Sequence, residues 1–384
     1  MTTAILTLNA GSSSLKLGLF DGDRVLASGL VDRIGGDGVM RLNGANNALP
    51  QPTDADFSSH QAALTAALIT LDAAFPGLTI TAVGHRVVHG GPDFTAPAVV
   101  TPTVLAKLEG YAPFAPLHQS HNLAGIRAAI TAFPQAVQVA CFDTAFHRNQ
   151  PWENDTYALP RSYYDKGVRR YGFHGLSYQF IAGELARTHP DLAAGRVIVA
   201  HLGNGASMCA MQGGRGIAST MGFSALDGLA MGTRVGQIDP GVLLYLMEQE
   251  GMGAAAISDL LYRQSGLLGL SGISNDMRGL EASDDPQAAQ AIGYFCARIQ
   301  REIGSLAAAL GGLDALVFTG GIGENSARIR AQVCDGMRWI GIALDASQRD
   351  GVISTKDSPV IVIVIATNEE QVIARACALT IGTP

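Results

Sequence analysis

Charged residues are scarce in this 384-residue sequence, at 15% where roughly 25% is usual. Apolar residues make up 47%, so the chain can bury large cores, and extensive disorder is excluded. Acidic residues outnumber basic ones by 33 to 26, which gives a net charge of −7 and argues against a broad nucleic-acid-binding face. At roughly 150 residues or more per domain, the length predicts two domains.

Long hydrophobic runs and cysteine motifs are also missing. The longest uninterrupted apolar run, Val360 to Ala366, is far shorter than the roughly 20 residues that span a membrane. No charged leader precedes the first lysine, Lys16. The 5 cysteines are scattered without C-x-x-C or zinc-type spacing, so we expect reduced, buried thiols. These absences predict a cytoplasmic protein that binds neither membranes nor nucleic acid.

Glycine, by contrast, is abundant, with 46 residues that gather in clusters. Residues 4–26 (AILTLNAGSSSLKLGLFDGDRVL) and 197–217 (VIVAHLGNGASMCAMQGGRGI) follow one plan of strand, Gly-rich turn, strand, tight hairpin and strand. This approximate repeat predicts two similar domains, although any two hairpin pairs share some likeness. The remaining pattern predicts an α/β chain. Strands are expected at residues 81–88, 138–142, 315–318 and 360–365, helices at 60–74, 120–132, 177–188, 240–250 and 287–310, and a surface loop at 42–56.

Three Gly-rich turns could bind phosphate groups. Residues 9–16 (NAGSSSLK) offer backbone amides, hydroxyls and Lys16, and residues 201–205 (HLGNG) form the matching turn of the second copy. Residues 319–325 (TGGIGEN) follow an apolar strand and precede an expected helix at 326–337, which would place amides at a helix N-terminus. Small polar residues also make ordinary turns, so each motif alone is weak.

The third turn also nearly matches a dinucleotide-binding fingerprint, with Ser326 at its last glycine position and Asp345 as the ribose-binding acid. An NAD(P)-binding domain is therefore an alternative. That alternative leaves the two hairpin turns unexplained.

Several polar residues stand at expected strand ends. Arg86 and Arg234 could each bind a carboxylate or phosphate with two parallel N–H groups, or could form structural ion pairs. Asp143 ends one expected strand, where an acid can hold Mg²⁺ or orient a reactant. Glu369 follows another strand and could bind Mg²⁺ or cap a helix, and His174 could donate a hydrogen bond to a phosphoryl group or be purely structural.

Taken together, these motifs resemble the acetate/propionate kinase family, within the sugar kinase–Hsp70–actin fold. The resemblance runs over nearly the whole chain, through LNAGSSSLK, GHRVVHGG, APLH, FDTAFH, RRYGFHG, AHLGNGAS, MGTR, SGLLGLSG, NDMRG, TGGIGENS and TNEE. It implies an α/β fold of two duplicated domains, of the actin-like ATPase or ribonuclease H-like type, that close over a central cleft. The N-terminal domain would comprise residues 1–147 plus 368–384, and the nucleotide-binding domain residues 148–367.

The resemblance also implies roles for particular residues. Asn9 and Glu369 would hold Mg²⁺ (or Mn²⁺), with Asp143 near them. Arg86 would pair with the acyl carboxylate, while His174 and Arg234 would stabilise the phosphoryl group in flight. The residues that would bind ATP or ADP are Lys16, His201, Leu202, Gly203, Asn204, Gly205, Asp276, Met277, Arg278, Gly321, Ile322, Gly323, Glu324 and Asn325. Val88, Leu117 and Phe173 would line the pocket for the methyl group of acetate, and the protein would be a homodimer.

The sequence departs from the family pattern at several positions. Ala225 replaces a proline that helps to line the acyl pocket, so acetate is not distinguished from propionate or another short acid. Gln119, Ala218 and Gln237 also replace usual residues. A non-catalytic or ATPase-only actin-like module is an alternative of another class, although such a module has no use for Arg86 and Arg234 at an acyl acceptor.

Overall fold

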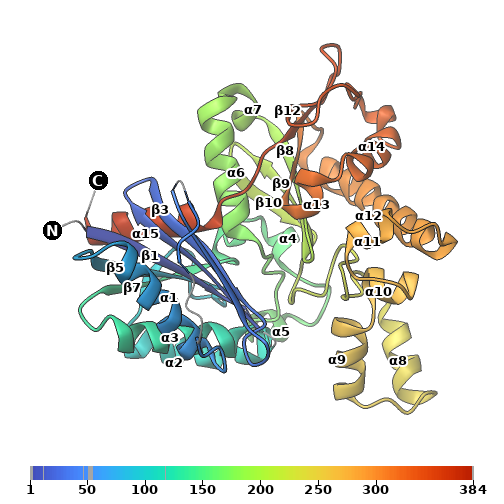
Figure 1. Cartoon of the computed structure of the whole chain (residues 1–384). Helices are drawn as coiled ribbons and strands as arrows, with labels where there is room; N and C mark the ends of the chain where they lie inside the picture. Colours follow the sequence, from blue (N-terminus) through green and yellow to red (C-terminus); the bar gives the residue numbers. More distant parts are fainter. Residues whose placement is uncertain (1–2, 12, 46, 51–54, 117, 383–384) are drawn as a thin grey trace. The chain divides into compact units, whose positions relative to one another are not determined.

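The computed structural model describes residues 3–11, 13–45, 47–50, 55–116 and 118–382 (Figure 1). Contacts divide the chain into two compact units. Met1–Arg148 together with Asn368–Pro384 form the N-terminal unit, and Asn149–Thr367 form the C-terminal unit. All five cysteines are unpaired and buried, as expected. Among the described residues, no helix has the length and apolar character needed to cross a membrane.

The described part of the N-terminal unit contains a seven-stranded sheet in the order β4-β3-β2-β1-β5-β7-β6. Strands β1 to β4 form an antiparallel meander, whereas β5 and β7 continue the sheet parallel to β1. The strands are β1 (Thr3–Ala10), β2 (Ser14–Asp21), β3 (Arg24–Asp32), β4 (Val39–Gly44), β5 (Thr79–Val87), β6 (Ala98–Val99) and β7 (Val137–Phe142).

The described part of the C-terminal unit repeats this plan in a six-stranded sheet, in the order β10-β9-β8-β11-β13-β12. Its meander again leads into parallel strands, and the hairpin between its second and third strands turns at Gly213 and Gly214, whose positive φ angles suit a two-residue turn. The expected duplication is confirmed. The strands are β8 (Arg196–Leu202), β9 (Ala206–Gln212), β10 (Arg215–Ser219), β11 (Ala315–Thr319), β12 (Gly351–Val352) and β13 (Ile361–Val364).

Helices cover both sheets. In the N-terminal unit they are α1 (His60–Ala74), α2 (Pro102–Gly110), α3 (Gln119–Ala132) and α15 (Glu369–Ile381). In the C-terminal unit they are α4 (Trp152–Asp155), α5 (Arg161–Asp165), α6 (Gly175–Thr188), α7 (Pro190–Ala194), α8 (Pro240–Glu248), α9 (Ala254–Arg263), α10 (Gly266–Ser271), α11 (Met277–Glu281), α12 (Pro286–Leu310), α13 (Gly320–Asn325) and α14 (Ala327–Asp335). The long helix α12 begins at the Asp285 cap, continues from Pro286 and ends at left-handed Gly311, a sequence typical of a well-capped helix.

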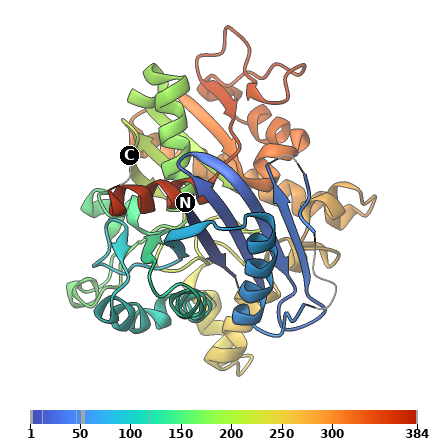
Figure 2. The same cartoon turned by 60° about the vertical axis from the view of Figure 1, so that its left-hand side comes forward.

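Helix α15 brings the end of the chain back to its beginning. It packs against β1 and β5, and Figures 1 and 2 show this red helix beside the blue N-terminal strands. The approach is close, because a Cβ atom at Gly84 would lie only 2.3 Å from Ile373 and 2.7 Å from Cys377 Sγ. The side chain of Asn368 caps α15 by accepting from the amide of Gln371, which places Glu369 and Glu370 in its first turn.

Two expectations from sequence are wrong, and one alternative is excluded. Residues 42–56 are not all loop, because Leu42 to Gly44 belong to edge strand β4, with Leu42 only 1% exposed. The TGGIGEN turn does not merely precede a helix, since residues 320–325 themselves form α13. The dinucleotide-binding alternative also fails, because its fold requires a mostly parallel sheet, whereas β8, β9 and β10 are antiparallel.

Candidate functional site

Arg86 and Asp143 meet at the carboxyl ends of two adjacent parallel strands. Strands β5 and β7 pair in a register that aligns Val87 with Phe142, so Arg86 on β5 lies next to the residue that follows β7. The Nε and Nη2 groups of Arg86 donate to Oδ1 and Oδ2 of Asp143 at 3.0 and 2.7 Å. The Asp143 side chain is 1% exposed and that of Arg86 20%. Asp143 therefore holds the guanidinium by one edge.

Two further oxygen ligands approach Arg86 in the same unit. Nη1 of Arg86 donates to Oδ1 of Asn9 at 3.3 Å, and Oε2 of Glu369 lies 3.7 Å from Nε. Burial opposes the positive charge, but the carboxylates of Asp143, Glu369 and Glu370 outweigh it and raise the pKa of Arg86. Arg86 is thus charged at every physiological pH.

The opposite edge of the Arg86 guanidinium carries donors that no described residue accepts from. Of its five N–H groups, the hydrogen bonds to Asp143 and Asn9 use one on Nε, one on Nη1 and one on Nη2. Within the described part of the chain, the second N–H of each Nη has no hydrogen-bond partner. Two parallel N–H groups of this kind match the two oxygens of a carboxylate.

The oxygens of Asn9 and Glu369 fit a Mg²⁺ ion. Mg²⁺ prefers oxygen ligands and binds through one or two protein groups, together with water and substrate phosphates. Both oxygens of Asp143 accept from Arg86, whereas Glu369 approaches Arg86 no closer than 3.7 Å, so its oxygens are better suited to a cation. Lys16 forms an ion pair of 2.7 Å with Glu370, on the same turn of α15.

In the C-terminal unit, His174 occupies a left-handed backbone conformation (φ 56°, ψ 25°) at the start of α6. Its ring stacks on that of His201 with centroids 4.3 Å apart, and its Nδ1 lies 2.8 Å from Oγ of Ser207. A Cβ atom at Gly205 would lie 3.2 Å from Nε2 of His174. The reactive nitrogen of the ring therefore faces the HLGNG turn.

The MGTR turn approaches the same HLGNG turn. The amide of Gly232 donates to the carbonyl of Asn204, and a Cβ atom at Gly232 would lie 2.3 Å from Oδ1 of Asn204. Arg234 follows in this turn, and its Nη1 donates to the carbonyl of Ala225 at 3.3 Å. Arg234 therefore lies beside Ala225, which replaces the proline of the family pattern.

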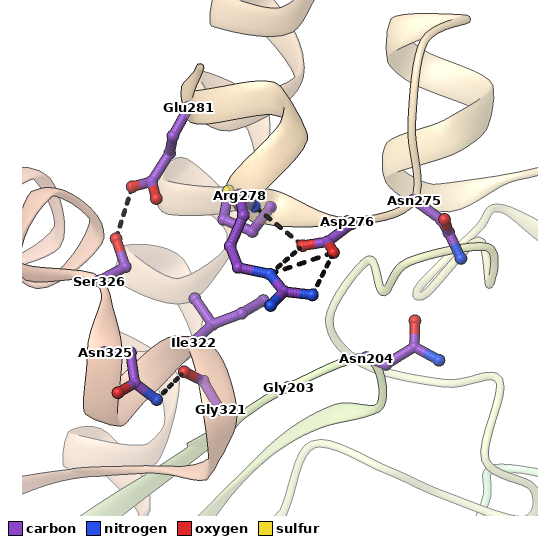
Figure 3. A pocket seen from close by; sticks show the side chains of 11 residues that line it. Gly203, Asn204, Asn275, Asp276, Arg278, Glu281, Gly321, Ile322, Asn325 and Ser326 are labelled. Carbon is purple, nitrogen blue, oxygen red and sulfur yellow. Dashed lines mark hydrogen bonds and ion pairs between the residues drawn. The ribbon is translucent and has the colours of Figure 1, made fainter. Parts of the chain in front are cut away.

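A cavity of about 730 Å³ lies beside these turns, within the range of roughly 300–1,000 Å³ that is usual for small-molecule sites (Figure 3). Figure 3 shows Asn204 and Asn275 on one side of it, and Asn325 and Ser326 on the other. Asp276 pairs with Arg278 at 2.6 Å at its edge. Its lining residues are Gly203, Asn204, Asn275, Asp276, Met277, Arg278, Glu281, Gly321, Ile322, Asn325 and Ser326.

Most, but not all, of the residues expected to bind the nucleotide line this cavity. His201, Leu202, Gly205, Gly323, Glu324 and Lys16 are not among its lining residues. Oε1 of Glu324 instead accepts from the amides of Gly320, at 2.8 Å, and Thr367, at 3.2 Å. Its carboxylate therefore holds two segments of backbone together.

The sequence interpretation missed three lining residues. Asn275 belongs to the NDMRG motif but was not assigned a role, and Ser326 was considered only for the dinucleotide-binding alternative. Glu281 lies at the end of α11, two residues after the NDMRG motif, and accepts from the hydroxyl of Ser326. A helical projection of residues 277–281 is the signal that could have found it.

Of the residues expected to surround the acyl group, the structure describes Val88 and Phe173 but not Leu117. Val88 is 7% exposed, and its amide donates to Oδ1 of Asn122. Phe173 is 2% exposed and directly precedes His174. Leu117 lies outside the described residues.

Comparisons with known proteins identify the family to which the chain belongs. A model of the acetokinase family matches residues 4–375. The acetate kinase of Methylocella silvestris is 52% identical over 392 aligned residues, which cover 98% of this chain and 97% of that protein. The solved structure of Porphyromonas gingivalis acetate kinase is 39% identical, with a TM-score of 0.88 over 99% of this chain and 100% of that one.

A solved propionate kinase from Francisella tularensis is similarly related, at 36% identity and a TM-score of 0.90 over 97% of this chain and 98% of that one. The fold is accordingly the expected α/β arrangement of two sheets of the actin-like ATPase type. The motifs, the fold and these relatives agree over almost the full length of the sequence, and the chain belongs to the acetokinase family.

Proposed function

We propose that this protein is an acetate kinase, which reversibly transfers the γ-phosphoryl group of ATP to acetate and yields acetyl phosphate and ADP. The observation that carries the proposal is the edge of Arg86 that Asp143 and Asn9 leave vacant. Two parallel N–H groups there suit the carboxylate of a small acid. The nucleotide would bind in the cavity of the C-terminal unit.

The chemistry needs charge neutralisation more than proton transfer. Acetate is already ionised at pH 7, so one of its oxygens can attack the γ-phosphorus directly. That O–P bond forms while the bond between the γ-phosphorus and the β,γ-bridging oxygen breaks, and ADP leaves with the bonding pair. Arg86, Arg234 and His174 would reduce the repulsion between the two anions during this in-line transfer. Asp143 would act by holding Arg86, not as a base.

Asn9 and Glu369 would hold Mg²⁺, or Mn²⁺ in its place. When bound there, the ion would neutralise charge on the phosphate oxygens of the nucleotide. Their all-oxygen ligand set, with Glu369 only loosely paired to Arg86, supports this assignment. We assign acyl and phosphate contacts to residues 1–147 plus 368–384, and nucleotide binding to residues 148–367.

A hydroxylamine-trap assay tests the proposal. Hydroxylamine converts an acyl phosphate into a coloured hydroxamate, so purified protein is incubated with Mg·ATP and formate, acetate, propionate or butyrate in turn. We expect the highest kcat/KM with acetate. If folded protein that binds ATP gives no signal with any acid, the chain is an ATPase-only or non-catalytic module instead.

A propionate kinase is the second candidate, and Ala225 is the observation that favours it. The family pattern has proline at this position, and Ala225 contacts Arg234 through its carbonyl, so the smaller side chain leaves more room near the acyl group. Ala225→Pro should therefore raise the ratio of kcat/KM for acetate to that for propionate several-fold. An unchanged ratio contradicts a role for Ala225 in acid selection.

We also propose a homodimer that forms through α8. The apolar side chains of Val242, Leu244, Tyr245 and Met247 on this helix are 41–58% exposed, and α8 has no buried residue. A helix so apolar and so exposed is typical of a surface that a second copy covers. The cytoplasmic location expected from the sequence stays a prediction.

A further inference from the structure

Behind His174 lies a chain of buried hydroxyl groups that the proposed chemistry does not yet use. Oγ of Ser207, on β9, lies 2.8 Å from Nδ1 of His174 and 2.5 Å from the hydroxyl oxygen of Tyr178, on α6. Ser207 and Tyr178 are both 0% exposed. Buried polar groups in such a network have few alternative partners, so their protons take a defined arrangement.

Either Tyr178 or Ser207 can donate in their hydrogen bond, and the tautomer of His174 depends on which of them does. Burial raises the pKa of Tyr178 well above its usual value and outweighs the opposing effect of the hydrogen bond with Ser207, so the phenol keeps a proton that it can donate. When Tyr178 donates to Oγ of Ser207, the single hydroxyl proton of Ser207 is directed to Nδ1 of His174. A neutral imidazole that accepts at Nδ1 carries its proton on Nε2.

The second histidine favours the neutral form of the first. Nδ1 of His201 lies 2.9 Å from Oγ of Ser177, another fully buried serine, so both rings have a hydroxyl at the same nitrogen. The two rings stack with centroids 4.3 Å apart. Two imidazolium charges at that distance on these partly buried rings would repel each other.

We propose that Ser207 and Tyr178 are positioning residues, which hold neutral His174 as the tautomer with its proton on Nε2. That N–H lies beside the Gly203–Gly205 turn, because a Cβ atom at Gly205 would lie 3.2 Å from Nε2. His174 therefore donates a hydrogen bond without having to acquire a positive charge. The identity of the acceptor, a transferring phosphoryl group, rests on the proposed function.

Tautomers are read directly from the imidazole ¹⁵N chemical shifts of the full-length protein labelled at histidine. The signals of His174 are assigned by their loss in His174→Gln. We expect the pattern of a neutral ring protonated at Nε2 in the wild type, and a shift toward the Nδ1-protonated form in Ser207→Ala. The spectra are recorded near neutral pH, at about 7.5. An Nδ1-protonated or cationic His174 in the wild type under these conditions overturns the proposal.

Kinetics provide the second readout. Ser207→Ala should lower kcat for acyl phosphate formation roughly 10- to 100-fold, the usual effect of removing a group that orients a reactive imidazole. Tyr178→Phe should cost less, because Ser207 keeps its proton, and Ser207→Thr should restore most of kcat. The KM values for ATP and acetate should stay within about twofold, since Ser207 lies behind the ring and outside the cavity lining.

Ser219→Ala is the matched control. Ser219 is a serine on neighbouring strand β10 whose Oγ is buried without a hydrogen-bond partner among the described residues, so its loss should leave kcat unchanged. Equal losses of kcat in Ser207→Ala and Ser219→Ala would mean a general packing effect and overturn the proposal. Wild-type protein that shows the Nε2 tautomer but forms no acyl phosphate would instead refute the proposed function alone.

Discussion

Asp143 holds one edge of Arg86, and we propose that the other edge binds the carboxylate of the substrate. A lysine at this position keeps the positive charge but lacks the planar guanidinium that donates two hydrogen bonds to one carboxylate. We expect Arg86→Lys to lower kcat/KM for acetate roughly 100-fold, about the 3 kcal/mol of a lost charged hydrogen-bond pair, and to leave ATP binding within about threefold. Hydroxamate kinetics and ATP titration calorimetry measure the two effects. A comparable loss of ATP affinity contradicts this assignment of Arg86.

The neighbouring His85 predicts how stability depends on pH. Burial lowers the pKa of His85 to about 4, although Nε2 lies 2.8 Å from the acceptor Oε1 of Gln138. Because the unfolded chain binds this proton near pH 6.5 and the folded chain only near 4, stability falls as the pH decreases between these values. From pH 7 to pH 5 the loss from this one group is about 2 kcal/mol.

Urea unfolding of the wild type and of His85→Gln at both pH values checks this contribution. The variant lacks the titrating group, so its free energy of unfolding should fall by about 2 kcal/mol less over the same interval. Parallel pH dependence in the two proteins would show that His85 is not the group responsible.

At the scale of elements, α10 supports the MGTR turn through one glycine. Gly266 has φ +64°, and a Cβ atom there would lie 2.1 Å from the carbonyl oxygen of Met231 and 2.8 Å from that of Arg234. Gly266→Ala should therefore destabilise the protein by about 2 kcal/mol or more and lower kcat, because the turn that carries Arg234 must move.

A second glycine provides the control for this substitution. A Cβ atom at Gly293, in the middle of α12, would contact nothing within 4 Å. Gly293→Ala should stabilise the protein by roughly 0.5–1 kcal/mol through helix propensity. Thermal unfolding compares the two variants, and equal effects would contradict the special geometry of Gly266.

Elements with strong local signals were predictable from sequence. Helix α1 begins and ends at the expected residues, His60 and Ala74, because Ser59 caps it and apolar residues repeat along it. Strand β4 was missed, since its six residues lie at a sheet edge and its pairing with β3 is a long-range contact that no local pattern encodes. Helix α13 was missed because glycines suggest a loop.

The candidate site shows the same division. Spacing and strand ends indicated Arg86 and Asp143 separately, but their bidentate contact depends on the register between β5 and β7. The hydroxyl network behind His174 involves Ser207, which ends the AHLGNGAS motif but whose contact with His174 no sequence pattern predicts. Such contacts arise from packing, which residue types alone do not determine.

For the whole molecule, the apolar surface of α8 predicts the oligomeric state. Leu244→Asp combined with Met247→Asp places two charges on side chains that are 58% and 47% exposed, and it should convert a dimer into folded monomers. Light scattering after size-exclusion chromatography measures the mass. Leu379→Asp, at an 81% exposed leucine on α15, is the control that should remain dimeric. A wild type that is already monomeric contradicts the proposal.

Glu324 joins α13 to the segment of chain that connects the C-terminal unit with α15. Its carboxylate fastens the Gly320 amide, at the start of α13, to Thr367, the last residue of the C-terminal unit. Glu369 follows two residues later, at most about 7 Å along an extended chain. The proposed nucleotide cavity, which α13 helps to line, and the proposed metal ligand Glu369 are therefore separated by one carboxylate contact and a very short stretch of chain.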